Sequence, residues 1–173
     1  MRNDVLLISP NTIRSVTTAS DSLDDCYITP AILDAQLTGL QPIIGTPLYD
    51  RLCELVSDGT IEEPANHYYK ELLGVYVECY LVYQTQMEML VQNMTRSHNG
   101  GNVQYVDAQT YVQNTLQDVK YLKDHYSNKA AFFAGRMVDY LNEYSNRIPE
   151  YKATTYEMDS CVKADTYRCG IKL

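Results

Sequence analysis

Apolar side chains recur every three or four residues along the stretch from Pro64 to Met94. The positions that follow this spacing are Tyr69, Leu72, Tyr76, Tyr80, Tyr83, Met87, Leu90 and Met94. Their average step matches the α-helical period of about 3.6 residues, so the pattern predicts one long amphipathic helix. The first half carries further apolar residues on other faces, which indicates packing on two sides.

A second long pattern of the same period begins near Asp107, which is a suitable N-cap. Its apolar positions are Val112, Leu116, Val119, Leu122, Tyr126, Ala130, Phe133, Met137, Tyr140 and Tyr144. Ser127-Asn128 is a point where this helix could bend or break. Residues 96–102, rich in Asn and Gly, form the strongest turn signal in the chain, so the two long helices are predicted to form an antiparallel hairpin.

Two short helices are predicted before this hairpin. The first starts at Thr29-Pro30 and stops at Gln41-Pro42, since threonine can cap a helix and proline is tolerated in its first turn. The second starts at Thr46-Pro47 and ends at residues 57–59, where Gly59 can take the left-handed conformation. Gly45 lies at the corner between them. The predicted fold class is an all-α helical bundle comprising residues 29–151.

Both termini lack helical periodicity. Residues 1–28 open with a β-like run from Val5 to Ile8 and continue with a Ser/Thr/Asp-rich passage, so we expect an extended arm. Residues 152–173 are expected to form an extended tail, with a small β-hairpin as an alternative. An arm or tail of this kind needs a surface to lie on. The candidate contacts with another subunit or partner are Val5, Leu7, Tyr156, Val162, Tyr167 and Ile171.

The chain has 173 residues and a net charge of −8, which fits one domain with appendages. Residues 1–63, 64–151 and 152–173 carry net charges of −7, −2 and +1. A sequence-reading nucleic-acid binder has the opposite sign, so any contact with DNA is expected to be weak, local or indirect unless several copies assemble a positive surface. The longest apolar stretch is too short to span a bilayer, and we expect a soluble, unsecreted protein.

The 16 tyrosines dominate the aromatic content, beside two phenylalanines and no tryptophan. Three interpretations of the tyrosine stripe in the first long helix stay open. An intramolecular core is favoured for Tyr69, Tyr76, Tyr80 and Tyr83. A subunit interface comes second, because one hairpin cannot easily bury so many tyrosines, and base stacking comes last because interleaved Lys and Arg are missing.

No catalytic or metal-binding motif is present in the sequence. The five cysteines show no CxxC pair and no zinc spacing with histidine, so free thiols are expected, with Cys161 and Cys169 as the one pair close enough along the tail for a disulfide. An enzyme would need His67, His125 and a carboxylate or Cys79 to converge in space, which their spacing does not favour. We therefore expect no enzymatic activity, cofactor or metal.

The segment around the glycine corner carries a family resemblance. Ala35-Gln36 on one helix is followed by Ile43-Ile44-Gly45-Thr46-Pro47-Leu48-Tyr49-Asp50-Arg51-Leu52. This pattern resembles the head-to-tail connector (adaptor) proteins of phages and prophages of Bacteroidetes, including crAss-like phages. The later segments 137–142 and 148–151 look like the closing helix and the Pro-x-aromatic exit of that family. The similarity covers residues 28 to 151, and its motif residues are Gln36, Gly45, Leu48, Tyr49 and Leu52.

The resemblance implies a virion protein of the neck, assembled in the host cytoplasm. Such proteins form a ring, taken to be twelvefold, between the portal protein and the tail, and double-stranded DNA passes through the ring without specific contacts. The acidic balance fits this implication, because acidic groups lining a channel repel a polyanion. We assign the corner residues to folding. The alternative from another class is a soluble helical partner-binding or regulatory module that docks through an exposed Tyr/Met face.

Overall fold

The computed structural model describes residues 5–16, 24–94, 96–98, 101–103 and 116–151. The fold is all-α, as the sequence predicts, with one short hairpin of strands. The elements are α1 (Pro10–Val16), α2 (Asp25–Asp34), the π-helical η1 (Ala35–Leu40), α3 (Gln41–Ile44), α4 (Thr46–Ser57), the 3₁₀ turns η2 (Thr60–Glu62) and η3 (Pro64–Asn66), α5 (His67–Glu71), the π-helical η4 (Leu72–Val77), α6 (Glu78–Met94), β1 (Arg96–His98), β2 (Gly101–Val103) and α7 (Leu116–Glu143).

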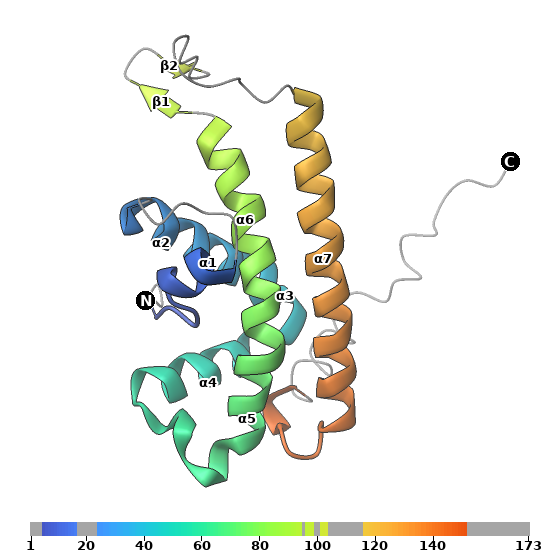
Figure 1. The fold of residues 1–173 in the computed structure, drawn as a ribbon. Helices are drawn as coiled ribbons and strands as arrows, with labels where there is room; N and C mark the ends of the chain where they lie inside the picture. Colours follow the sequence, from blue (N-terminus) through green and yellow to red (C-terminus); the bar gives the residue numbers. More distant parts are fainter. Residues whose placement is uncertain (1–4, 17–23, 95, 99–100, 104–115, 152–173) are drawn as a thin grey trace, which may run out of the picture.

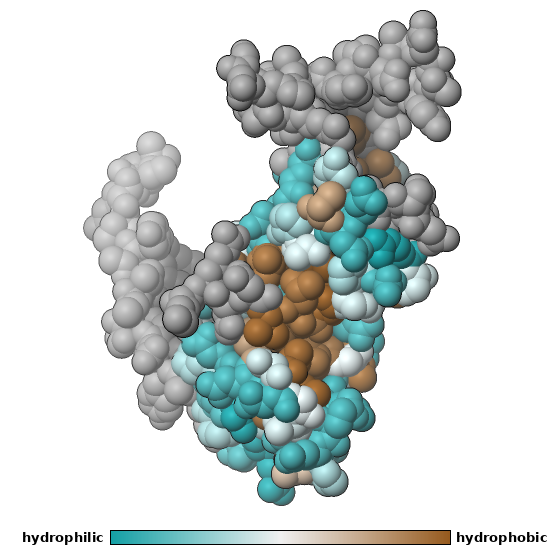
Figure 2. Space-filling model, turned by 90° about the vertical axis from the view of Figure 1, so that its left-hand side faces the viewer, coloured by the Kyte–Doolittle hydropathy of each residue, from teal (hydrophilic) through white to brown (hydrophobic). Residues whose placement is uncertain are grey.

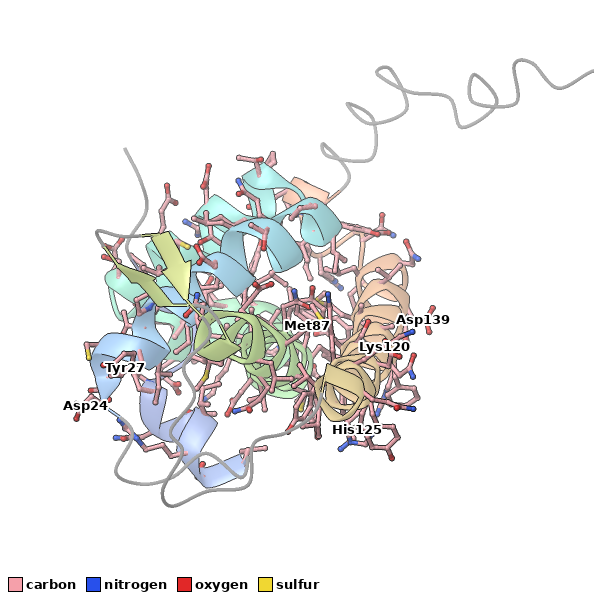
Figure 3. All side chains as sticks on the ribbon, turned by 90° about the horizontal axis from the view of Figure 1, so that it is seen from above. Asp24, Tyr27, Met87, Lys120, His125 and Asp139 are labelled. Atoms are coloured by element: carbon pink, nitrogen blue, oxygen red, sulfur yellow. The ribbon has the colours of Figure 1, made fainter. Side chains whose placement is uncertain are left out.

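The two long helices lie side by side and are antiparallel (Figure 1). The first is continuous from α5 through η4 to α6, so the predicted helix is confirmed, with one wider π turn in the middle. The second, α7, runs as one helix through Ser127 and Asn128, so the chain is not interrupted at this candidate point. Its predicted start at Asp107 lies outside the described residues. α1 and α2 pack against the other side of α6 (Figures 1 and 3).

The reversal after α6 contains two short antiparallel strands. β1 pairs with β2 through Arg96 opposite Val103 and His98 opposite Gly101. A reversal of chain direction was predicted for residues 96–102, and the antiparallel pairing of β1 with β2 confirms it. The sequence pattern did not indicate the strands.

Both proline-based boundaries of the first short helix are wrong. α2 begins at Asp25 instead of Pro30, so the proline lies inside the helix and one backbone hydrogen bond is lost. The extra turn buries Ile28 completely, which offsets that loss. At the other end the chain stays helical through Ile44, because Pro42 falls in the first turn of α3, where a proline costs little.

The expectation of an extended arm outside the bundle is also wrong for residues 5–16. These residues pack on the chain's own helices, and they form α1 from Pro10 onward. Leu7, Ile8 and Ile13 are buried in the core, while Val5 is half-buried against it. The chain's own helices therefore provide the surface on which residues 5–16 lie.

The start and end predicted for α4 are confirmed. The helix begins at Thr46 with Pro47 in its first turn, and Gly59 adopts the left-handed conformation just after its end, with φ of 70°.

On the face at the left of Figure 1, apolar side chains gather in a patch surrounded by hydrophilic ones (Figure 2). In the described part of the chain no helix is both long and apolar enough to cross a bilayer.

Candidate functional site

The corner motif forms the buried centre of the N-terminal half. Gln36 belongs to η1 and Tyr49 to α4, and both side chains are almost completely buried. Gln36 Nε2 donates a hydrogen bond of 3.1 Å to Tyr49 Oη, so the structure joins these two residues directly. Leu48 and Leu52, on the same face of α4, are fully buried in the surrounding core.

The carboxamide of Gln36 also holds the N-terminal segment. The backbone N–H of Leu7 donates to Gln36 Oε1 at 2.8 Å, and Gln36 Nε2 donates to the carbonyl oxygen of Val5 at 3.0 Å. One side-chain amide thus satisfies the backbone groups on both sides of Leu6, as a neighbouring strand would. An amide buried among apolar groups is costly unless it is fully bonded, and here it is. We call Gln36, Tyr49 and the backbone of residues 5–7 the corner network.

Gly45 makes the corner possible. Its φ of 83° and ψ of 153° lie in a region that side chains rarely adopt, and its surroundings are buried. Its N–H donates to the carbonyl of Gln41 at 2.8 Å, and its own carbonyl accepts from the N–H of Tyr49 at 3.0 Å. The sharp change of direction between α3 and α4 therefore places Tyr49 opposite Gln36.

Tyr76 and Tyr83 of the tyrosine stripe lie in the seam between the first long helix and α7, whereas the hydroxyl of Tyr80 lies beside Gly39 of η1. The ring pairs are Tyr76 with Tyr140 at 4.7 Å, Tyr68 with Tyr144 at 5.2 Å, and Tyr83 stacked on Phe133 at 5.6 Å between centroids. Met87 lies between α6 and α7 as well (Figure 3). Tyr69 and Tyr80 are buried, and Tyr76 and Tyr83 pack against the core. The interpretation of Tyr69, Tyr76, Tyr80 and Tyr83 as intramolecular core is confirmed.

Cations from α7 and the segment after it cover the seam. Lys129 Nζ lies 4.9 Å from the centre of the Tyr83 ring, Arg136 Cζ 5.9 Å from that of Tyr76, and Arg147 Cζ 6.0 Å from that of Tyr68. Attraction between a cation and the face of an aromatic ring contributes about 0.5–1 kcal/mol at exposed sites. These cation–aromatic contacts therefore help to hold α7 and the segment after it against the first long helix.

Buried tyrosine hydroxyls bind carboxylates at the lower end of the hairpin. Tyr140 Oη donates to Glu71 Oε2 at 3.1 Å, and Tyr69 Oη donates to Glu150 Oε2 at 2.8 Å. Burial, followed by the hydrogen bond to Glu150, raises the pKa of Tyr69 to about 12. Burial also raises the pKa of Tyr49 and of Tyr80 to about 12, and that of Tyr140 further still. These phenols therefore keep their protons to higher pH in the folded state than in the unfolded chain.

The free energy of unfolding is expected to fall as the pH rises from about 10 towards 12. Tyrosines in the unfolded chain lose their protons near pH 10, whereas Tyr49, Tyr69 and Tyr80 in the folded chain keep theirs to about pH 12. Urea unfolding at pH 9, 10 and 11 measures the slope. Tyr49→Phe should reduce that slope, while Tyr121→Phe is the matched control because its side chain is 71% exposed. An equal slope in both variants would contradict the assignment.

The residues that an enzyme would need are not brought together. The ring of His67 contacts Tyr68, which packs on Tyr144 just after the C-terminal end of α7, whereas His125 contacts Tyr121 and Tyr126. Positions 125 and 144 are separated by about 28 Å along a helix axis. Among the described residues no group of three or more His, Cys, Asp or Glu side chains could hold a metal ion. Cys26, Cys53 and Cys79 are free thiols.

The predicted partner contacts divide into two groups. Leu7 is buried by the chain's own helices, which corrects its assignment as an intermolecular contact. The carbonyl oxygen of Val5 accepts a hydrogen bond from Gln36 of the same chain. Tyr156, Val162, Tyr167 and Ile171 lie outside the described residues, as do Cys161 and Cys169. Sequence reasoning missed that the motif residue Gln36 holds residues 5–7, because the two segments are about 30 positions apart.

The fold and the corner define the class of protein: it is an α-helical protein built on a long helical hairpin, with a buried polar corner network in its N-terminal half. Residues 40–160 match the model of a family of unknown function, DUF6712. Since the match covers more than half of the chain, the protein belongs to this family. Neither the curated proteins nor the solved structures include a significant match.

Proposed function

We propose that the protein is a structural subunit of the head-to-tail connector of a tailed phage. The observation that carries this proposal is the corner network. The residues of the connector-like motif, Gln36, Gly45, Leu48, Tyr49 and Leu52, together form the buried centre around which the N-terminal half folds. The resemblance therefore concerns residues that determine the fold, which supports relationship more strongly than surface similarity would.

The protomer is also suited to assembly into a ring, twelvefold in the proteins it resembles. A hairpin of two long helices, held by stacked rings and cations, is a rigid element from which a wall can be built. Large apolar side chains remain on the surface, among them Tyr27, Tyr121 and Phe132, with exposed fractions of 46%, 71% and 60%. Aromatic side chains of this kind are enriched at protein–protein interfaces.

The charge of the chain supports a passive role towards DNA. The net charge is −8, and residues 1–63 account for most of it. Acidic side chains facing a channel would repel the phosphate backbone and let DNA pass without being held. In this proposal the portal protein and adjacent neck or tail proteins are the partners, and the assembled virion is the location.

Light scattering of the purified protein, alone and mixed with its cognate portal protein, tests the proposal. We expect a large species of defined mass in at least one of the two conditions. Tyr121→Asp should lower the fraction of that species, because a buried charge at a subunit contact is strongly unfavourable, while Lys123→Ala on the same helix is the control. A protein that stays small even with the portal would overturn a direct portal contact.

The second candidate is a soluble helical partner-binding module without a virion role. The exposed tyrosine and methionine face first expected for it is not available, because Tyr76, Tyr83 and Met87 lie in the seam with α7. An apolar groove between α1, α6 and α7, described below, favours this candidate instead. The same light-scattering experiment separates the two, since a regulatory module would remain small with the portal and bind another partner.

A further inference from the structure

A groove crosses the middle of the long hairpin on the side of α1. Its hollow of about 130 Å³ lies between the end of α1, the middle of the first long helix, and α7. Seven residues line it: Val16, Gly74, Glu78, Cys79, Val82, Tyr83 and Phe133. In Figures 1 and 3, α6 lies between α1 and α7. Residues of η4 and α6 form the floor of the groove, and Val16 of α1 and Phe133 of α7 line its two sides. We call it the α6 groove.

The α6 groove is not filled by the described residues. Val16, which lines it, is 57% exposed. A Cβ atom added at Gly74 would meet nothing within 4 Å. Glycine inside a helix costs about 1 kcal/mol relative to alanine, and no contact within the described residues requires it there. The open space above Gly74 is therefore available to another chain segment.

The sequence of residues 167–173 has an apolar pattern suited to binding in the α6 groove. Apolar side chains alternate with polar or small ones, with Tyr167, Cys169, Ile171 and Leu173 on one side of an extended chain and Arg168, Gly170 and Lys172 on the other. Side chains two positions apart are separated by about 6.6 Å, so two or three of them fit along the groove floor between Gly74 and Tyr83.

Charge favours the same occupant. Residues 1–151 carry an excess of acidic groups, whereas 152–173 is the part of the chain with a positive net charge. Within 167–173 there are two basic residues and no acidic one. Glu78 lines the groove among its apolar residues and offers a carboxylate to Arg168 or Lys172.

The segment can reach the groove. Tyr151, the last described residue, packs against the core, and its neighbour Glu150 is bonded to Tyr69. Tyr69 precedes Gly74 by five positions, or about 7.5 Å along a helix axis. The stretch from Tyr151 to Tyr167 can span up to about 50 Å. A tether of this length also gives an effective concentration on the order of millimolar, so a weak contact suffices.

We propose that residues 167–173 of the chain dock in the α6 groove of the same molecule when the protein is a free protomer. The apolar side of the segment covers Val82, Phe133 and the open space at Gly74, and its basic residues face Glu78. This contact adds to the proposed function without depending on it, because it concerns the single chain.

Two native cysteines make the proposal testable in the full-length protein. Cys79 lies in the groove and Cys169 lies on the apolar side of the segment. A variant with Cys26→Ser and Cys161→Ser keeps this pair, and the matched variant with Cys26→Ser and Cys169→Ser keeps Cys79 and Cys161 instead. After brief oxidation with diamide at low protein concentration, we expect about tenfold more Cys79–Cys169 than Cys79–Cys161 disulfide within monomers, since only one partner is held in the groove.

Equal yields of the two disulfides would overturn the proposal. Cross-linked dimers in place of cross-linked monomers would also overturn it, and would assign the groove to the tail of a neighbouring copy. A second measurement uses Ile171→Asp in the otherwise native chain, which should release the segment and raise the fluorescence of an apolar-binding dye by about twofold or more. Val162→Asp, outside the segment, should leave the dye signal unchanged, and equal effects of the two substitutions would count against docking.

Discussion

Replacing Gly45 by valine is expected to prevent the chain from folding. The backbone at this position has φ of 83° and ψ of 153°, where a residue other than glycine costs about 1–3 kcal/mol, and a β-branched side chain costs more. The position is also buried, so the added carbons must be accommodated within a packed core. Since domains of this size have a total stability of about 5–15 kcal/mol, the combined loss removes most of it.

Far-UV circular dichroism and urea unfolding measure the effect. Gly45→Ala should keep the helical signal while losing about 2–3 kcal/mol of stability, and Gly45→Val should lose the cooperative transition. Gly59→Val is the matched control, because Gly59 also has a positive φ but has open space around it, and about 1–2 kcal/mol is expected there. A Gly45→Val protein with a native transition would show that the corner can be rebuilt without glycine.

The elements with strong periodicity could be predicted from the sequence. Each long helix carries an apolar residue at every third or fourth position, and a pattern of that length leaves a clear signal whatever surrounds it. The corner residues were singled out through a family pattern, and Gln36 and Tyr49 do meet in the core. A local pattern could not show why they meet, because a hydrogen bond between two helices is not visible in either of them.

The misplaced boundaries follow from rules that are local. Pro30 was interpreted as a helix start, yet burial of Ile28 outweighs the hydrogen bond that the proline removes inside α2. Pro42 was interpreted as a stop because the residue before a proline disfavours the helical conformation, yet it falls in the first turn of α3. Tertiary packing decides such cases. The two π turns, η1 and η4, left no signal either, since one extra residue in a turn shifts the apolar stripe without breaking it.

The N-terminal segment illustrates the same limit at longer range. Val5 to Ile8 has the composition of a strand, and its backbone is in fact bonded as a strand would be. Its partner is the side chain of Gln36, which no strand-pairing rule anticipates. The α6 groove is likewise invisible in the sequence, because Val16, Gly74 and Phe133 come from three separate segments.

Replacing Gln36 by alanine is expected to release the N-terminal segment and to lower the stability by about 3–5 kcal/mol, because it leaves the N–H of Leu7, the carbonyl of Val5 and the hydroxyl of Tyr49 without their shared partner. Urea unfolding measures the total loss. Hydrogen exchange locates it, and the amide of Leu7 should exchange about a hundredfold faster, ahead of the amides in α6.

Tyr49→Phe keeps the experiment informative if the alanine variant does not fold. It removes the hydroxyl partner of Gln36 and leaves the bonds to Val5 and Leu7 in place, so about 1 kcal/mol is expected, with little change in the exchange of Leu7. Gln41→Ala is the control for losing a glutamine, because its amide bonds Thr46 in an exposed setting. If Gln36→Ala costs no more than Gln41→Ala, the corner network does not hold the N-terminal segment, and apolar burial of Leu7, Ile8 and Ile13 alone must do so.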